Sequence, residues 1–185
     1  MFDALNSFEL TILEGIRNAI GCSFLDGFFS AITKFADAGI GWIVISVLLL
    51  LFKRTRKTGI MVGLALVIGL LTVNCGIKPL VGRIRPYELS EAMKAALLVD
   101  PLSDGSFPSG HTLASFEAAT VLMIRDKRYG IPALVLAFII AFSRLYLCVH
   151  YPSDVLAGLI LGVIYGILAV YIINKAYKFF NKKSA

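Results

Sequence analysis

Long apolar stretches recur along this chain and are separated by short polar segments. Three of them, 59–77, 131–149 and 155–173, are each 19 residues long. A helix of that length measures about 28 Å, which is close to the thickness of the hydrocarbon core of a bilayer. Two shorter stretches, 39–52 and 112–124, can be extended backwards to a similar length. The pattern predicts an all-α protein with several membrane-crossing helices.

The first 38 residues have a weaker pattern. Apolar side chains recur there at spacings of three and four, which predicts an amphipathic helix lying in the membrane interface. A second apolar stretch, 24–36, carries charged residues near its ends and is either a thin first span or a re-entrant segment. We therefore divide a single domain, 1–185, into an N-terminal part (1–38), a core (39–173) and a basic tail (174–185). The recurring residues are Leu5, Phe8, Ile12, Ile16 and Ala19.

The composition agrees with membrane insertion. Hydrophobic residues make up 58% of the chain and charged residues only 16%, with a mean hydropathy of +0.82. Soluble domains have about 25% charged residues, so this composition excludes a soluble globular enzyme and a disordered polyampholyte. The cysteines, Cys22, Cys75 and Cys148, are too widely spaced for a disulfide framework or a metal site. We expect them to be buried as small hydrophobic residues.

The basic residues fall mainly in three clusters, at 53–57, 125–128 and 175–183. If the spans between them alternate, all three clusters lie on one side of the membrane, and the positive-inside rule makes that side cytoplasmic. Residues 79–110 and 150–153 then lie on the outer face. The net charge of +6 is thus explained by topology and does not indicate nucleic-acid binding.

The remaining polar residues gather at the predicted outer ends of the spans. The first group contains Lys78 and Arg85, with six residues between them that include Pro79 and Gly82. Two fixed cations across such a turn suit an anion with several oxygens, because Arg offers a planar fork and Lys a point charge. The alternative is a pair of snorkelling cations at a helix end, without a ligand.

The second group is Pro108-Ser109-Gly110-His111, directly before the stretch that starts at Thr112. A serine in front of a helix is a capping signal, and the free N–H groups of a helix start attract anions, which glycine lets approach closely. A capped helix start needs no function, but the imidazole of His111 beside it favours a binding or catalytic site.

The third group consists of Ser143, Arg144, His150 and Asp154. An arginine in an apolar stretch is costly and usually faces a polar cavity, so Arg144 is a candidate site residue. If a helix starts near His150, Asp154 can reach one ring nitrogen, fix the tautomer and leave the other nitrogen as a nucleophile or base. A purely structural hydrogen bond between the two is the alternative.

No cluster of Asp and Glu with metal-ligand spacing accompanies these groups, and Asp154 is expected to serve His150 alone. Chemistry on a phosphate without a divalent metal needs arginine and lysine to balance the phosphate charge. We therefore expect neither a metal nor a cofactor.

Together the three groups resemble the motifs of the type 2 phosphatidic acid phosphatase (PAP2) superfamily, whose active site is shared with vanadium haloperoxidases. The motifs K-x6-R-P, P-S-G-H and S-R-x5-H-x3-D are all complete here and follow one another in the same order. The resemblance covers about residues 40–173. It implies a haloperoxidase-like helical core with six spans, which favours residues 24–36, alone or with the preceding helix, as the first span.

The resemblance also implies a role for each motif residue. His150 would attack phosphorus and form a phosphohistidine, while Asp154 holds and polarises it. His111 would protonate the leaving oxygen and then activate the water that hydrolyses the intermediate. The phosphate oxygens would be held by the other motif residues: Lys78, Arg85, Ser109, Gly110 and Arg144.

The chain looks most like bacterial integral membrane lipid phosphatases, which implies a plasma-membrane location with the site facing outwards. The expected substrate is a membrane lipid, undecaprenyl diphosphate, with phosphatidylglycerophosphate or phosphatidic acid as the alternative. A transporter or a non-catalytic anion-binding protein is the alternative from another class. A transporter would spread polar groups through the depth of the bilayer, whereas here they gather at one face.

Two features inside the spans are independent of these motifs. Glu117 lies in the stretch 112–124 and is either a hydrogen-bonded core group or a polar lining of the cavity. Gly158, Gly162 and Gly166 recur every four residues in the last stretch, which predicts close packing of helices within the membrane.

The outer segment 90–99 has the pattern of a capped amphipathic helix. We expect it to lie on the outer leaflet beside the site. There Met93, Leu97 and Leu98 would influence the choice of lipid without taking part in chemistry.

Overall fold

The computed structural model describes residues 3–183, so residues 1–2 of the N-terminal part and 184–185 of the basic tail lie outside the described residues. The regular elements within 3–183 are all helical, which confirms the all-α class. In chain order they are α1 (Asp3–Ile20), α2 (Ser23–Phe35), η1 (Asp37–Gly39), α3 (Ile40–Leu51), α4 (Arg56–Gly69), η2 (Leu70–Ile77), α5 (Lys78–Val81), α6 (Pro86–Leu89), α7 (Glu91–Ala95), α8 (Gly110–Arg125), α9 (Lys127–Tyr146) and α10 (Pro152–Lys183).

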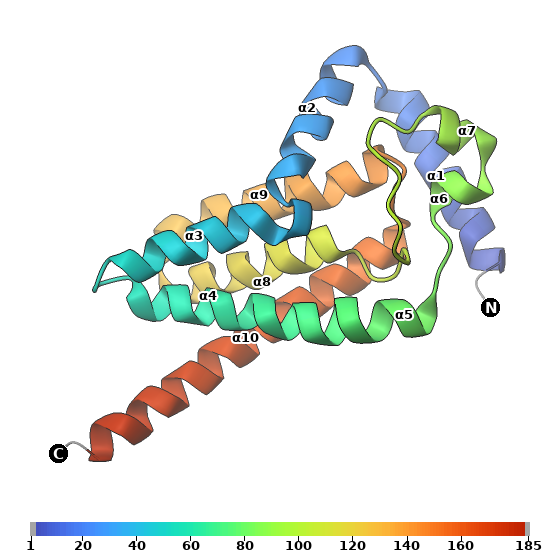
Figure 1. Ribbon diagram of the computed structural model, residues 1–185. Helices are drawn as coiled ribbons and strands as arrows, with labels where there is room; N and C mark the ends of the chain where they lie inside the picture. Colours follow the sequence, from blue (N-terminus) through green and yellow to red (C-terminus); the bar gives the residue numbers. More distant parts are fainter. Residues whose placement is uncertain (1–2, 184–185) are drawn as a thin grey trace.

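The long helices α3, α4, α8, α9 and α10 form one bundle (Figure 1). Helix α8 lies at its centre and packs against α9, α10 and α4. Helix α1 lies across one end of the bundle, where α6, α7 and the connection from α9 to α10 are also found (Figure 1). We call this the motif end, because all three motif groups lie there.

Three helical segments of the described chain are long and apolar enough to cross a membrane: Arg56–Leu89, Lys127–Tyr146 and Pro152–Asn181. A fourth is added if the bent pair Ser23–Phe35 and Asp37–Leu51, with an angle of 40° between its halves, is one span. This confirms a multi-pass membrane protein. It does not confirm the six spans that the resemblance implies.

Helix α8 is short, with 16 residues, and most of its side chains are buried. The last span approaches it very closely. A Cβ atom added to Gly158 of α10 would lie 2.7 Å from the carbonyl oxygen of Ser109, and one added to Gly162 would lie 2.7 Å from that of Leu113. The close packing expected from the glycine repeat is confirmed, and it holds α10 against the start of α8.

The chain bends between α2 and α3. Ala38 (φ +49°) and Gly39 (φ +70°) both have a left-handed backbone, which glycine adopts readily and alanine rarely. The bend packs against α8. As a result Asp37, which precedes these two residues, is brought to the motif end.

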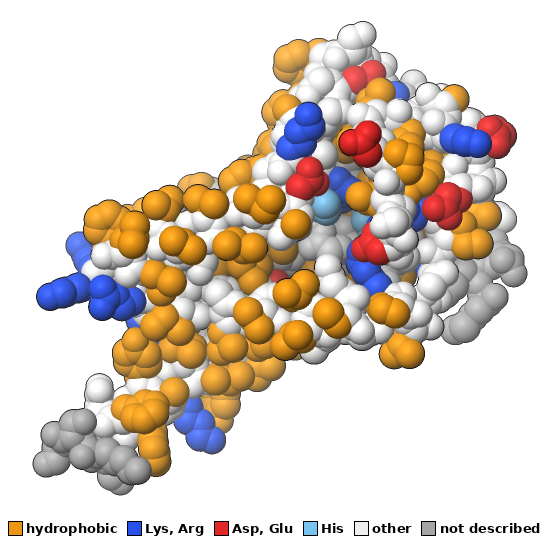
Figure 2. All heavy atoms as spheres, in the orientation of Figure 1, with side chains coloured by type: hydrophobic (Ala, Val, Ile, Leu, Met, Phe, Trp, Pro, Cys, Tyr) orange, Lys and Arg blue, Asp and Glu red, His pale blue; other side chains and the backbone are white. Residues whose placement is uncertain are grey.

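The flank of the bundle is apolar, and charged side chains gather at its ends (Figure 2). Large apolar side chains are exposed on α3, α9 and α10, among them Ile43, Val47, Phe138 and Ile164. An apolar surface of this size on a helical bundle is typical of contact with lipid. The basic residues 53–54 are exposed in the connection between α3 and α4, at the end opposite the motifs.

The segment 90–99 differs from the expectation. Helix α7 has only five residues, and its cap is the Ser90 hydroxyl, which accepts a 3.4 Å hydrogen bond from the N–H of Met93. Met93 is buried in an apolar cluster with Leu13 of α1 and Tyr87 of α6. The expected placement of Met93 on the leaflet is therefore wrong, because α1 covers that side of the segment.

The cysteines also differ in part. Cys148 is buried, as expected, whereas Cys22 and Cys75 are exposed. The expected burial is wrong for these two. Cys22 lies in the connection between α1 and α2, and Cys75 lies in η2, where an apolar surrounding can be lipid as well as core.

Candidate active site

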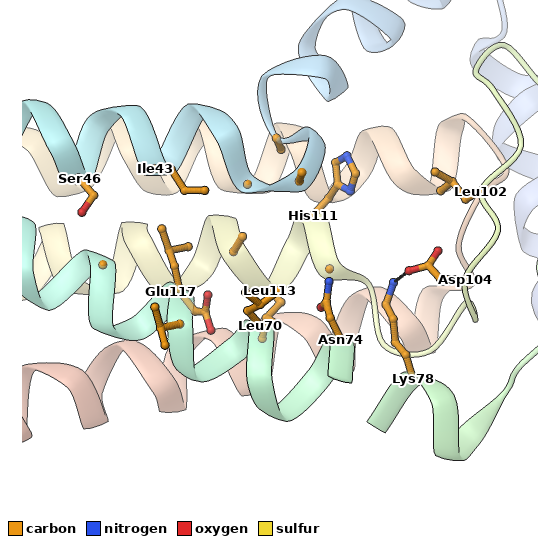
Figure 3. Close-up of a pocket in the computed structure, with 18 of the residues that line it drawn as sticks. Ile43, Ser46, Leu70, Asn74, Lys78, Leu102, Asp104, His111, Leu113 and Glu117 are labelled. Atoms are coloured by element: carbon orange, nitrogen blue, oxygen red, sulfur yellow. Dashed lines mark hydrogen bonds and ion pairs between the residues drawn. The ribbon is translucent and has the colours of Figure 1, made fainter. Parts of the chain in front are cut away.

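The three motif groups surround one end of a cavity of about 520 Å³ (Figure 3). Each group contributes to the polar lining: Lys78, Arg85, Gly110, His111 and His150. The other predicted site residues, Ser109, Arg144 and Asp154, are buried behind this lining.

The cavity continues from this polar end along α8 between α3 and α4. Its lining there is mostly apolar, with Ile43, Val67 and Leu70 among the side chains. Ser46 and Glu117 line its far part, and Glu117 Oε1 has no hydrogen-bond partner among the described residues. The structure therefore supports the interpretation of Glu117 as a polar lining of the cavity and not as a hydrogen-bonded core group.

The two cations of the first motif share one carboxylate. Lys78 Nζ donates to one oxygen of Asp104, and Arg85 Nη2 donates to the other at 2.7 Å. Arg85 Nη1 donates to the carbonyl oxygen of Val149 at 2.8 Å and lies 3.3 Å from His150 Nε2. Arg85 thus links the first motif directly to the histidine of the third.

His150 lies in the tight connection between α9 and α10 and is almost fully buried. Its Nδ1 is 3.5 Å from Asp154 Oδ2 and 3.5 Å from the hydroxyl of Ser106. Burial lowers the pKa of His150 to about 3, although Asp154 acts in the opposite direction. The imidazole is therefore neutral at pH 7, and we assign the proton to Nδ1, which leaves the lone pair on Nε2.

Asp154 does not serve His150 alone, so that expectation is wrong. Its Oδ2 accepts hydrogen bonds from the Ser106 hydroxyl and from the N–H of Tyr151 at 2.9 Å. Its Oδ1 accepts from Arg83 Nη1 at 2.5 Å. Four groups therefore fix this carboxylate in place, and the histidine is one of them.

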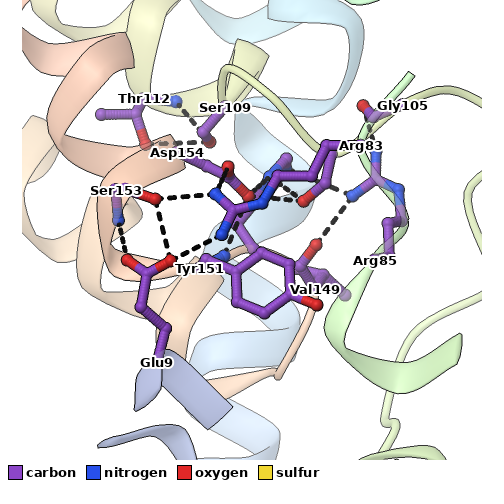
Figure 4. Close-up of polar contacts among 12 residues, drawn as sticks. Glu9, Arg83, Arg85, Gly105, Ser109, Thr112, Val149, Tyr151, Ser153 and Asp154 are labelled. Carbon is purple, nitrogen blue, oxygen red and sulfur yellow. Dashed lines mark hydrogen bonds and ion pairs between the residues drawn. The ribbon is translucent and has the colours of Figure 1, made fainter. Parts of the chain in front are cut away.

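Arg83 is the centre of a second buried cluster (Figure 4). Besides Asp154, its guanidinium contacts the carboxylate of Glu9 at 2.6 Å and the side-chain oxygen of Asn6 at 2.7 Å. Glu9 also accepts a 2.6 Å hydrogen bond from the N–H of Ser153. The cluster ties α1 to the start of α10 and to the carboxylate behind His150.

His111 lies in the first turn of α8 and lines the cavity from that side. Its Nε2 lies 2.7 Å from Asp37 Oδ1, at the bend between α2 and α3. A carboxylate at this distance stabilises the imidazolium form of a histidine. Burial acts in the opposite direction and lowers the pKa of His111 to about 4, so Asp37 orients the ring and only partly offsets the cost of charging it.

Arg144 lies in the last turn of α9 and is buried. Its Nη1 donates to the hydroxyl of Thr33, and its Nε has no hydrogen-bond partner among the described residues. A buried guanidinium with an unsatisfied donor is costly, so Arg144 retains the capacity to bind an anion.

Ser109 acts as the N-cap of α8. Its hydroxyl oxygen accepts from the hydroxyl of Thr112 at 3.0 Å and from the N–H of the same residue at 3.5 Å. A Cβ atom added to Gly110 would lie 3.9 Å from Lys78 Nζ, with no closer neighbour than Asn74 Oδ1 at 3.8 Å. The missing side chain leaves the start of α8 accessible to an oxyanion beside the Lys78 ammonium.

Asp104 is the largest addition that the structure makes to the predicted site. Partial burial acts to raise the pKa of its carboxyl, but the contacts with Lys78 and Arg85 outweigh that effect and hold it at about 2. The Asp104 side chain is thus an anion at any pH near neutrality. Within the part of the chain that the structure describes, no group of three or more His, Cys, Asp or Glu side chains could hold a metal ion.

Sequence reasoning gave no role in the site to Asp104, Asp37, Arg83 or Glu9. Arg83 offered one signal, because it lies only two residues before Arg85 in the first motif. Glu9 offered another, because a carboxylate among the apolar positions of an amphipathic helix suggests a buried partner. Neither aspartate lies near a motif residue that it contacts, so no local pattern identified them.

Residues 58–178, well over half of the chain, match the PAP2 superfamily. The chain belongs to this superfamily. The matched range contains all three motif groups, so the resemblance seen in the sequence is confirmed.

Two curated relatives illustrate the range of activities within the superfamily. An undecaprenyl-diphosphatase of Sulfolobus acidocaldarius is 35% identical over 150 residues, which is 80% of this chain and 70% of the relative. A lipid A 4'-phosphatase of Bacteroides thetaiotaomicron is 33% identical over 187 residues, which covers 95% of this chain and 81% of the relative. These relatives confirm the expected enzyme class, a membrane lipid phosphatase.

Solved structures share the fold. Aquifex aeolicus LpxE has a TM-score of 0.77 and 31% identity, covering 88% of this chain and 94% of its own. A PAP2-type phosphatidylglycerolphosphate phosphatase of Bacillus subtilis has a TM-score of 0.74 and 26% identity, covering 93% of this chain and 87% of its own. The PAP2 arrangement of helices thus extends over nearly the whole chain.

Proposed function

We propose that this membrane phosphatase hydrolyses a lipid diphosphate through a phosphohistidine on His150, with undecaprenyl diphosphate as substrate. The observation that carries the proposal is the cavity. It places His150, His111 and the cations Lys78 and Arg85 at one polar end, and it continues between apolar helices. A phosphate at the polar end would leave a hydrocarbon chain in the apolar part.

The chemistry follows from the positions of the two histidines. The neutral Nε2 of His150 attacks the terminal phosphorus, a P–N bond forms, and the bond to the leaving oxygen breaks. Burial lowers the pKa of His111 to about 4, so its protonated form needs the nearby anions, Asp37 and the bound phosphate. In that form His111 donates its proton to the leaving oxygen. His111 then accepts a proton from water, which attacks phosphorus, breaks the P–N bond and releases inorganic phosphate.

The fixed charges stabilise the transition state of both steps. Lys78 and Arg85 would contact the phosphate oxygens together with the N–H groups at the start of α8, where Ser109 and Gly110 lie. Arg144, buried behind the lining with an Nε that is unpaired within residues 3–183, would add its positive charge. Such donors need no reorganisation during the reaction, and removing one costs about 10²–10³ in rate in other enzymes. Asp154 keeps the His150 tautomer and is itself fixed by Arg83.

The relatives support two classes of substrate. The similarity to an undecaprenyl-diphosphatase supports an isoprenyl diphosphate as the substrate of this chain. The relative with the larger coverage acts on lipid A, so a lipid A phosphate is the second candidate. Phosphatidylglycerophosphate and phosphatidic acid are further candidates, and a non-catalytic anion-binding protein is the alternative of another class.

We place the motif end at the outer face of a plasma membrane. The exposed basic residues at the opposite end agree with a cytoplasmic position there. Six spans would require α2, alone or with α1, to cross the bilayer separately from α3. Glu9 of α1 is instead held by Arg83 at the motif end, which supports α1 lying on the outer surface. With α2 and α3 as one bent span, five segments cross the bilayer.

Cys22 provides a test of this topology, because it is exposed at the start of α2, near the end of α9. In a variant lacking Cys75 and Cys148, an impermeant maleimide should label Cys22 in intact cells. A Lys53→Cys variant without the native cysteines should be labelled only after permeabilisation. The reverse pattern would place the site on the cytoplasmic side.

Activity is tested by phosphate release from the detergent-purified protein in excess EDTA. The substrates are undecaprenyl diphosphate, a lipid A phosphate, phosphatidylglycerophosphate and phosphatidic acid, with His150→Ala beside the unmodified protein. We expect the fastest release from undecaprenyl diphosphate, no release by the variant, and ³²P retained on the unmodified protein after acid-free quenching. Fastest release from another lipid would correct the substrate, and equal release by His150→Ala would exclude the histidine mechanism.

A further inference from the structure

We infer that Asp104 is an internal competitor of the substrate phosphate: its carboxylate occupies the anion position between Lys78 and Arg85 and must leave when phosphate binds. This inference rests on the proposed function of the site. It makes Asp104 a residue that sets affinity and product release, without a part in bond making or breaking.

The contacts of Asp104 resemble those of a bound anion. One carboxylate oxygen takes the Lys78 ammonium and the other takes Arg85 Nη2, so both cations are occupied by a single bidentate group. A phosphate makes the same kind of contact with a lysine and an arginine fork. Both cations line the cavity beside His150, so a phosphate within reach of its Nε2 would need the donors that Asp104 now uses.

The partners of this cluster differ greatly in exposure. The side chains of Lys78 and Arg85 are 7% and 1% exposed, whereas that of Asp104 is 48% exposed. The aspartate can therefore turn into water at little cost, while the buried cations need an anion at all times. A phosphate arriving in the cavity would supply that anion.

The backbone around Asp104 is fixed independently of its carboxylate. Arg85 Nε donates to the carbonyl oxygen of Asp104 at 3.0 Å, and the N–H of Ser106 donates to the carbonyl oxygen of Arg83 at 2.8 Å. Release of the cations therefore needs only a rotation of the Asp104 side chain. The connection between α7 and α8 can stay in place.

Competition of this kind has a use in the reaction cycle. Lys78, Arg85 and Arg144 together would hold a phosphate dianion tightly, and the last product is such a dianion. A carboxylate that returns to the cations displaces inorganic phosphate and frees His150 for the next substrate. Asp104 would thus weaken binding of the product in exchange for faster turnover.

A purely structural role for Asp104 predicts the opposite sign. If the carboxylate only orients Lys78 and Arg85, its removal disorders the cations and weakens phosphate binding. If it competes, its removal strengthens phosphate binding. The sign of one affinity change therefore separates the two roles.

The experiment measures binding of inorganic phosphate to the full-length protein in detergent by isothermal titration calorimetry. Asp104→Asn keeps the size of the side chain and removes its charge. Asp100→Asn, an exposed carboxylate of the same connection, is the matched control for net charge. We expect the Kd for phosphate to fall about tenfold in Asp104→Asn and less than twofold in Asp100→Asn. Turnover should show a lower KM together with a lower kcat, because product release slows.

An unchanged or higher Kd in Asp104→Asn would overturn the inference, and so would the absence of measurable phosphate binding in both proteins. If Asp104→Asn does not fold, Asp104→Ser provides the same comparison. Tighter phosphate binding without hydrolysis of any lipid would support the competition and contradict the proposed function. Hydrolysis without tighter binding would contradict the competition alone.

Discussion

Arg83 and Arg85 are two residues apart in the same segment, and both are buried. Arg83 contacts Glu9, Asn6 and Asp154, which are all buried themselves. Arg85 pairs with Asp104, whose side chain is half exposed. The same residue type thus serves two purposes, and the difference lies in whether the protein's own anion can be replaced.

Burial of a charge alone therefore does not identify a binding residue. A buried cation whose carboxylate partners are themselves buried belongs to the scaffold, because no ligand can replace those partners without breaking the fold. A buried cation whose partner reaches water can exchange that partner for a substrate. Five predictions test this distinction, beginning with the largest expected effect.

The first prediction concerns Arg83. Replacing it with Ala leaves two buried carboxylates, Glu9 and Asp154, without their cation, and breaking a buried ion pair costs about 3–5 kcal/mol. We expect a loss of that size in the unfolding free energy of the detergent-solubilised protein. Arg54→Ala, an exposed arginine, is the control. A loss below 1 kcal/mol for Arg83→Ala would contradict the scaffold role of Arg83 and remove its contrast with Arg85.

The second prediction concerns Arg85. Its replacement by Ala removes donors that face the phosphate, so kcat should fall by about 10²–10³. The unfolding free energy should fall by only about 1 kcal/mol, because Asp104 keeps Lys78 and water as partners. Arg85→Lys should restore part of the rate. A large loss of stability with normal turnover per folded molecule would assign Arg85 to the scaffold.

The third prediction compares two buried glutamates. Glu9 is paired with Arg83, whereas Glu117 Oε1 has no partner among the described residues. Replacing Glu117 with Met removes an unsatisfied buried group and should raise the unfolding free energy by about 1–2 kcal/mol. The same change at Glu9 should lower it. Destabilisation by Glu117→Met would indicate a partner in the cavity, such as lipid.

The fourth prediction concerns the contact between His111 and Asp37. Asp37→Asn removes the carboxylate 2.7 Å from its Nε2, and we expect hydrolysis of lipid substrates to slow on the order of tenfold. The loss should be much smaller for p-nitrophenyl phosphate, because its leaving group needs no proton. Equal losses for both kinds of substrate would show that Asp37 acts on something other than proton donation.

The fifth prediction uses the low pKa of Asp104, about 2. A carboxyl with a depressed pKa stays ionised above that value and loses its charge only as the pH falls through it. The ratio of phosphate Kd between the unmodified protein and Asp104→Asn should therefore stay constant within about twofold from pH 5 to pH 8. A ratio that falls steadily below pH 7 would mean that another group is responsible.

Much of this protein was predictable because its strongest signals are local. Apolar stretches of span length predicted the helices, since the bilayer sets their length and composition. The glycine repeat of α10 predicted close packing, because small residues at a four-residue spacing share one helix face. Lys78, Arg85, His111 and His150 were found from short spacings beside helix ends, and the cavity contains all four.

The contacts that complete the site were decided by the tertiary structure. Asp104 meets Lys78 across 26 residues, His111 meets Asp37 across 74, and Arg83 meets Glu9 across 74. Whether such residues touch depends on how separate helices cross and on the bend at Ala38, which no local spacing encodes. The burial of Met93 and the sharing of Asp154 have the same origin. The sequence determined which chemical groups lie at the motif end, and the packing of the helices decided which of their charges are fixed and which are open to a ligand.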